Sequence, residues 1–183
     1  WLLMEQQDAA GLMLFDHRIR EDVPPTMHKA RLRGLLELIE KNKPDASTDV
    51  KVPLRYLAER IRRRGMVVIL SDLFVPFEEF VAGLQRLRHA GHDVLVLQIL
   101  DRDEVEFSFR DNVMFDAMEL PERQVLIDPQ SLRHSYLAAM RRSVSRIRAA
   151  CTDHRIDYAM IATSDPLDVA LSTFLSQRAH RQK

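Results

Sequence analysis

Residues 65–72 read Gly-Met-Val-Val-Ile-Leu-Ser-Asp, a short apolar run that follows a glycine and ends in two polar residues. A continuous apolar run of strand length is typical of a parallel strand buried between helices. Similar runs occur at residues 12–15, 94–97 and 158–162, and helical patterns separate them. The sequence therefore predicts an α/β fold with a doubly wound, mostly parallel sheet that is flanked by helices.

The predicted helices share an amphipathic pattern of apolar residues at spacings of three and four. They lie at about residues 28–40, 53–63, 77–90, 129–153 and 166–179. The helix at 129–153 begins after Asp128 with Pro129 in its first turn and places Cys151 on its buried stripe. Gly11, Gly65 and Gly91 are interpreted as helix stops that release the chain into strands.

Two stretches depart from this alternation. Asp16 and His17 form a predicted tight turn into a short, charged, antiparallel edge strand at 18–20, beside residues 11–15. Residues 103–127 alternate in places and are interpreted as a β-rich insertion on the edge of the sheet. No linker-like composition divides the chain, so residues 1–183 are expected to form a single domain.

Composition narrows the classes of function. The chain has 183 residues with 27 basic and 27 acidic side chains, so it has no net positive charge that would attract nucleic acid. One cysteine excludes an internal disulfide and a multi-cysteine metal site. No apolar run approaches the roughly 20 residues that span a bilayer, and we expect a cytoplasmic chain with no nucleic-acid or membrane partner. The basic run at residues 60–64 is interpreted as a solvated helix end, and the seven histidines as surface or loop residues.

Ligands of open α/β sheets bind at the carboxyl ends of the strands. The polar residues that follow the apolar runs are Asp16, Ser71, Asp72, Asp101 and residues 163–165. Asp72 is the strongest candidate, because a carboxylate at the end of a central strand suits a hard cation such as Mg²⁺. The structural alternative is that Asp72 only caps its loop or the next helix. No catalytic motif is recognisable, so we do not expect an enzyme.

Several segments together resemble a known family: residues 7–16, Thr48 with Asp49, residues 62–73 and residues 91–98. They are similar to the von Willebrand factor A-like, Rossmann-like domains of the bacterial domain of unknown function number 58, from about residue 5 to residue 175. Members are typically encoded beside MoxR-type AAA+ ATPases and are thought to help them act on or assemble other proteins. The resemblance implies such an ATPase as the partner and assigns no biochemical activity.

The wider fold carries a metal-ion-dependent adhesion site. By resemblance, Thr48 matches its threonine and Asp72 its aspartate, with Ser71 and Asp16 at the rim and Mg²⁺ or Mn²⁺ as the ion. The Asp-x-Ser-x-Ser motif of this site has no match and would lie upstream of Trp1. The implied metal site is therefore incomplete, and binding is expected to be weak or absent.

The resemblance also implies that the first central strand is missing. Unpaired inner strand edges are costly. We therefore expect residues 11–15 to pair directly with residues 66–71, or a second copy of the chain to fill the gap as a homo-oligomer.

Three functions follow from the sequence. The first is a protein-interaction module that binds through the strand-end loops. The second is a magnesium-dependent hydrolase or phosphotransferase in which Asp72 holds the metal and Asp16 or Asp101 activates water. The third is a metal-free scaffold that assembles through residues 103–127.

Overall fold

The computed structural model describes residues 2–43, 48–109, 113–116, 124–169, 171–172 and 174. Its main sheet consists of β3 (Met66–Ser71), β4 (Asp93–Leu100) and β7 (Asp157–Ala162), which are parallel in the order β3-β4-β7. These strands coincide with three of the predicted apolar runs. The predicted α/β class with a parallel sheet is confirmed.

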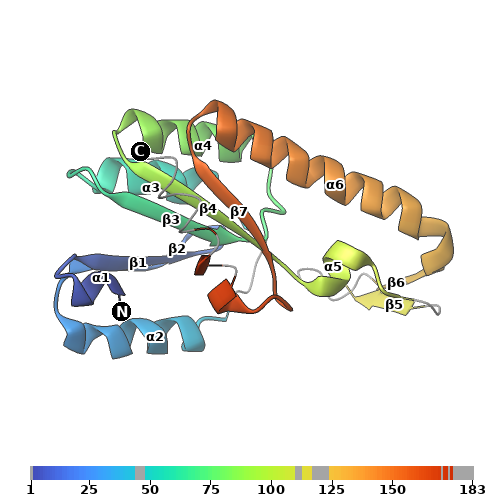
Figure 1. Ribbon diagram of the computed structural model, residues 1–183, viewed down its shortest axis with the longest axis horizontal. Helices are drawn as coiled ribbons and strands as arrows, with labels where there is room; N and C mark the ends of the chain where they lie inside the picture. Colours follow the sequence, from blue (N-terminus) through green and yellow to red (C-terminus); the bar gives the residue numbers. More distant parts are fainter. Residues whose placement is uncertain are drawn as a thin grey trace.

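Three helices cover one face of this sheet: α3 (Lys51–Arg60), α4 (Phe77–His89) and α6 (Pro129–Asp153) (Figure 1). Val67 and Ile69 point into the core that these helices close. The α6 start is as predicted, because the Asp128 carboxylate accepts a hydrogen bond from Gln130 N at 3.0 Å. Cys151 is fully buried, as predicted, and burial raises the pKa of its thiol to about 12.

The opposite face of the sheet is covered only in part. Leu95, Leu97 and Ile161 pack with Phe174 in a second buried cluster. The strand register places Met66, Val68 and Leu70 on the same face, yet these side chains are 50%, 43% and 64% exposed. Burial on both faces, predicted from continuous apolarity, therefore holds for β4 and is wrong for β3, because no described helix covers this strip.

β1 (Ala10–Phe15) and β2 (Ile19–Thr26) form a separate antiparallel ribbon. The predicted edge strand is confirmed and is longer than residues 18–20. α1 (Leu2–Glu5), the 3₁₀ turn η1 (Lys29–Arg31) and α2 (Leu32–Lys41) lie on this side of the molecule (Figure 1).

The predicted direct pairing of residues 11–15 with residues 66–71 is wrong. β1 pairs with β2, and β3 pairs with β4, in different sheets. Two register shifts interrupt the β1–β2 ladder, and such bulges increase twist, which sets this ribbon apart from the regular edge of β3. Exchange of a strand with a second copy stays a prediction.

Gly91 and Gly11 have different structural roles. Gly91 has φ +88° and ends α4 as predicted, because a left-handed backbone is easy only for glycine. Gly11 instead lies inside β1, where an added Cβ would meet Val23 O at 2.8 Å, so the prediction of a helix stop there is wrong. Its role is to let β2 approach closely.

The region at 103–127 is only partly a β insertion. Residues 102–106 form α5 (Arg102–Glu106) rather than a strand, because Asp101 and Glu104 form a capping box that starts a helix. β5 (Val113–Asp116) and β6 (Gln124–Ile127) form a separate antiparallel hairpin and do not extend the main sheet. Residues 110–112 and 117–123 lie outside the described residues, as does half of the predicted helix at 166–179, whose described residues 167–169, 171–172 and 174 are helical.

In the part of the chain that the structure describes, no helix combines the length and apolar character that a membrane span requires.

Candidate functional site at the strand ends

The loop after β3 is closed by its own polar side chains. Ser71 Oγ accepts a hydrogen bond from Leu73 N at 3.1 Å, and Asp72 Oδ1 accepts one from Phe74 N at 3.1 Å. Ser71 Oγ also donates to Asp72 Oδ1 at 3.4 Å. Leu73 adopts φ +62° while its side chain is buried. A buried leucine in the left-handed region is unusual, and the surrounding contacts hold it there.

Two buried hydrogen bonds in series connect this loop to β4 and β7. Gln98, 1% exposed in the middle of β4, donates from Nε2 to Asp72 O at 2.8 Å. The Tyr158 hydroxyl donates to Gln98 Oε1 at 2.6 Å, and burial raises the pKa of Tyr158 to about 12. Sequence reasoning missed both residues. The available signal was Gln98 itself, a lone amide within the apolar run of β4.

The fixed loop presents Phe74 to solvent. Its side chain is 54% exposed, although Leu73 next to it is buried. Leu167 and Val169, which follow β7, are 61% and 56% exposed, and Val52 at the start of α3 is 40% exposed. These segments follow the carboxyl ends of β3 and β7 or begin α3. We call these four residues the apolar rim.

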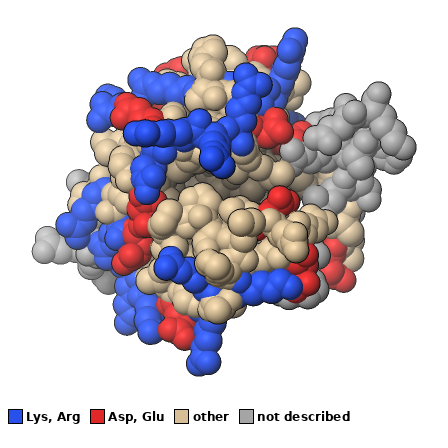
Figure 2. Space-filling view, turned by 90° about the vertical axis from the view of Figure 1, so that its left-hand side faces the viewer, with Lys and Arg blue, Asp and Glu red and all other residues tan. Residues whose placement is uncertain are grey.

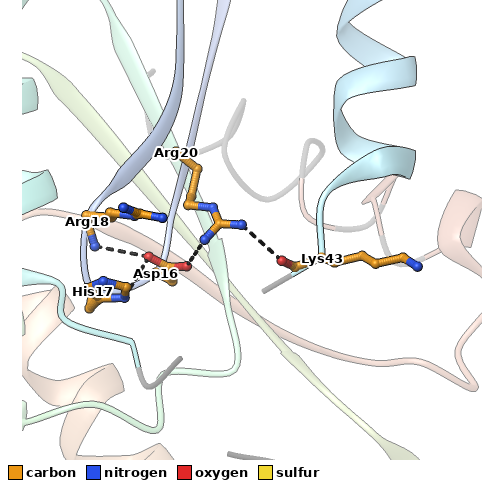
Figure 3. Close-up of polar contacts among 5 residues, drawn as sticks. All are labelled: Asp16, His17, Arg18, Arg20 and Lys43. Atoms are coloured by element: carbon orange, nitrogen blue, oxygen red, sulfur yellow. Dashed lines mark hydrogen bonds and ion pairs between the residues drawn. The ribbon is translucent and has the colours of Figure 1, made fainter. Parts of the chain in front are cut away.

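Asp16 is buried rather than exposed at a rim. Its carboxylate accepts hydrogen bonds from Arg18 N and Arg20 Nη1 at 3.1 Å each and lies 3.1 Å from His17 Nδ1 (Figure 3). Arg20 Nη2 also donates to Lys43 O at 3.3 Å. This network holds the turn between β1 and β2 against the end of α2. The prediction of Asp16 as a rim residue is therefore corrected.

The predicted site residues fall into two pairs. Asp49 N donates to Asp16 O at 3.1 Å, which places Thr48 beside the end of β1, whereas Ser71 ends β3 and Asp72 follows it. Among the residues that the structure describes, no group of three or more histidine, cysteine or acidic side chains could hold a metal ion. Asp72 Oδ1 already closes its loop, as the structural alternative required. The described residues therefore offer no cluster of carboxylates to an ion, and the Mg²⁺ site at Asp72 and Thr48 stays a prediction.

Asp101, the other carboxylate considered for activating water, is also engaged. Its Oδ1 accepts from Asp103 N at 2.8 Å, and its Oδ2 accepts from the Thr163 hydroxyl at 3.0 Å. Asp101 thus ties the end of β4 to the end of β7. With Asp72 and Gln98, it makes the carboxyl edge of the sheet a cross-linked and rigid platform.

A cavity of about 620 Å³ lies between α5 and α6. Its two arginines are both engaged, since Arg102 pairs with Glu106 at 3.0 Å and Arg133 donates to Phe107 O. The lining residues are Arg102, Glu106, Ser108, Phe109, Gln130 and Arg133. None of the predicted site residues lines this cavity.

Comparison with known proteins decides the family. The family model described as "Protein of unknown function DUF58" matches residues 1–146. The chain belongs to the DUF58 family. An uncharacterized protein of Mycobacterium tuberculosis and one of Mycobacterium bovis are each 36% identical to this DUF58 chain over 107 residues, which are 56% of the chain. The match covers 33% of each relative, so the chain spans about a third of the length of the curated relatives it matches.

Two solved structures share the fold of this DUF58 chain at 12% identity. The conserved hypothetical protein BatB from Bacteroides thetaiotaomicron superposes with a TM-score of 0.55, over 98% of this chain and 84% of that protein. An aerotolerance-related membrane protein from Bacteroides fragilis superposes with a TM-score of 0.53, over 96% of this chain and 86% of that one. At this level of identity the likeness concerns the fold alone.

Proposed function

We propose that this DUF58 chain is a protein-interaction module that binds its partner through the apolar rim, and that the partner is a MoxR-type AAA+ ATPase. The observation that carries the proposal is Phe74, an exposed aromatic side chain. Its loop is held by hydrogen bonds of the Asp72 side chain to Phe74 N and of the Asp72 carbonyl to Gln98. The family resemblance supports the choice of partner.

The physical argument rests on preorganisation. Aromatic side chains in the centre of an interface contribute much of the binding energy, and a rigid loop loses little conformational entropy when it binds. Leu73 fills the buried position, and the Asp72 carboxylate fixes the backbone at Phe74 by accepting a hydrogen bond from its amide, so the loop holds Phe74 at the surface. Leu167, Val169 and Val52 are the other exposed apolar side chains of the rim. Such an edge suits a partner with an apolar pocket.

The test is a pull-down with the purified chain from the cytosol of its own bacterium. We expect the wild-type chain to retain an AAA+ ATPase and Phe74→Ala to lose it, because the central aromatic anchor is removed. Ile39→Ala is the matched control, since Ile39 is 51% exposed on α2 and is not one of the four rim residues. Equal recovery with wild type and Phe74→Ala, or loss with Ile39→Ala alone, would contradict the proposal.

A second substitution separates loop shape from charge at Asp72. Asp72→Asn keeps an oxygen acceptor for Phe74 N and removes the carboxylate charge. If the loop acts by presenting Phe74, Asp72→Asn retains the ATPase and Asp72→Ala weakens its recovery. Loss of recovery in Asp72→Asn together with normal recovery in Phe74→Ala would show that the charge, and not the aromatic anchor, binds the partner.

A further inference from the structure

A group of arginines lies at the amino end of the main sheet, away from the apolar rim. α3 ends at Arg60, so Arg62, Arg63 and Arg64 lie beyond its last turn, in the loop that precedes β3. Within the basic run at 60–64, only Arg60 therefore occupies the last turn of a helix, where a cation balances the helix dipole. The charges of the other three serve no such purpose.

The loop before β3 adjoins the loop before β4. Asp93 N donates to Gly65 O at 3.0 Å, and a Cβ added at Gly91 would lie 2.9 Å from Arg64 Nε. The Arg64 side chain therefore lies against the end of α4, whose last turn contains Arg86. The connection from α3 and the end of α4 thus bring their arginines to one side of the molecule.

Four arginines form what we call the basic edge: Arg62, Arg63, Arg64 and Arg86. All four are exposed, and no ion pair joins them to another residue in the part of the chain that the structure describes. The nearby Asp93 is engaged by Arg88 Nη1 at 3.2 Å. Figure 2, which views the molecule from the left of Figure 1, shows Lys and Arg side chains gathered in its upper half, at the height of α3 and α4. A chain without net charge therefore carries a local positive surface.

The chemistry of the basic edge indicates what it binds. Its cations are all arginines, whose planar guanidinium groups hold carboxylates through paired hydrogen bonds. α3 and α4 both end here and contribute carbonyl groups, whereas compact phosphate sites use the amide groups of helix N-termini. Residues 61–65 and 86–93 contain no Phe, Tyr or Trp on which nucleic-acid bases could stack. Exposed arginines from two segments suit an extended ligand with several carboxylates.

We propose that the basic edge binds an extended acidic segment of a partner protein. The site is distinct from the apolar rim, because Arg64 lies ahead of β3 and Phe74 lies beyond its other end. The two surfaces can therefore be occupied at the same time. Successive Asp or Glu residues of the segment pair with the guanidinium groups, and salt weakens the binding because exposed charges are screened.

The probe is a fluorescein-labelled peptide of about ten alternating Asp and Glu residues, added to the whole chain while fluorescence anisotropy is measured. The control peptide has Asn in place of Asp and Gln in place of Glu, which keeps the size of the side chains and removes their charge. We expect saturable binding of the acidic peptide and at least about tenfold weaker binding of the neutral one. Binding of the acidic peptide should weaken as NaCl rises from about 50 mM to about 300 mM.

Variants of the chain locate the site. Arg63→Glu should weaken binding at least about threefold, and Arg62→Glu with Arg63→Glu at least about tenfold, because each change reverses a charge at the site. Arg31→Glu, the same change at an exposed arginine of η1, is the matched control and should leave binding unchanged. Phe74→Ala should also leave it unchanged, so failure of this proposal and failure of the proposed function give different results.

Three outcomes would overturn the proposal. Equal binding of the two peptides would show that carboxylates are not recognised. Equal losses in Arg63→Glu and Arg31→Glu would show that net charge alone governs binding. Tighter binding of phosphatidylserine vesicles or of single-stranded DNA than of the acidic peptide, abolished by the double variant, would assign the basic edge to a membrane or to nucleic acid instead.

Discussion

At the scale of single residues, His92 is the least satisfied side chain described. It is 1% exposed, and neither ring nitrogen has a hydrogen-bond partner. His92 lies in the loop between α4 and β4, which agrees with the prediction of a surface or loop position, but it follows the Gly91 stop and turns its ring into the core. Sequence pattern could not show this, since a histidine beside a glycine reads as a loop residue.

Replacing His92 should stabilise the protein. Two desolvated nitrogens without partners cost free energy, so we expect His92→Leu to raise the free energy of unfolding by about 1–2 kcal/mol. Urea denaturation measures the change. His89→Leu, at an exposed position three residues earlier, is the control and should change stability by less than about 0.5 kcal/mol. Destabilisation by His92→Leu would show that the ring has partners in solution.

Two buried groups set the response to alkaline pH. Burial raises the pKa of the Cys151 thiol from 9.0, and that of the Tyr158 hydroxyl from 10.0, to about 12 each. The folded state therefore holds these protons more tightly than the unfolded state. Their contribution to stability is complete below about pH 9 and is lost as pH rises towards 12.

The expected outcome is a free energy of unfolding that falls between pH 9 and 12, with a shallower fall in Cys151→Ala. Urea denaturation at intervals across this range measures both slopes. The same burial predicts that Cys151 reacts with a thiol reagent only when the chain unfolds. Parallel slopes for wild type and Cys151→Ala, or rapid reaction of the native chain, would contradict this account.

At the scale of elements, the contact between α3 and α4 depends on a missing side chain. An added Cβ at Gly83 of α4 would lie 2.4 Å from Leu54 Cδ1 and 2.8 Å from Leu54 Cβ of α3. The helices can approach this closely only because glycine has no side chain. The sequence predicted both helices, but nothing in it indicated that Gly83 faces Leu54.

Gly83→Ala should therefore lower the free energy of unfolding by about 1–3 kcal/mol, through overpacking. Gly34→Ala is the matched control in α2, where nothing lies within 4 Å of an added Cβ. It should raise stability by about 0.5–1 kcal/mol, because alanine favours the helix. A double variant, Gly83→Ala with Leu54→Ala, tests the cause. If its loss of stability equals the sum of the losses in the two single variants, the contact with Leu54 does not cause the effect of Gly83→Ala.

At the scale of the whole molecule, the parallel sheet and the helices over it were predictable, because buried strands and amphipathic helices leave periodic patterns. The surroundings of the residues in the adhesion-site interpretation were less predictable from the sequence. Asp72 ended the expected strand, yet its partners Gln98 and Phe74 come from tertiary and loop geometry. Asp16 was chosen for its position after a strand, and only the fold showed that it is buried and contacts Arg18, Arg20 and His17.

The metal prediction belongs to this scale too. We expect millimolar Mg²⁺ to leave the Tm of this chain unchanged, because no three histidine, cysteine or acidic side chains of the described residues are grouped to hold an ion. A thermal scan with and without Mg²⁺ measures it, with Asp72→Ala as the comparison. A rise in Tm with Mg²⁺ that disappears in Asp72→Ala would contradict this expectation and support the adhesion-site interpretation.

The sequence by itself determined the local structure: where apolar runs become strands, where Asp128 starts α6, and where Gly91 ends α4. These depend on neighbouring residues, whose spacing is written in the chain. Only the tertiary structure decided which edges and faces meet solvent. Val68 and Val96 lie in similar apolar runs, yet one is 43% exposed and the other fully buried. Burial depends on which distant segment packs against a strand, and a linear pattern does not record that partner.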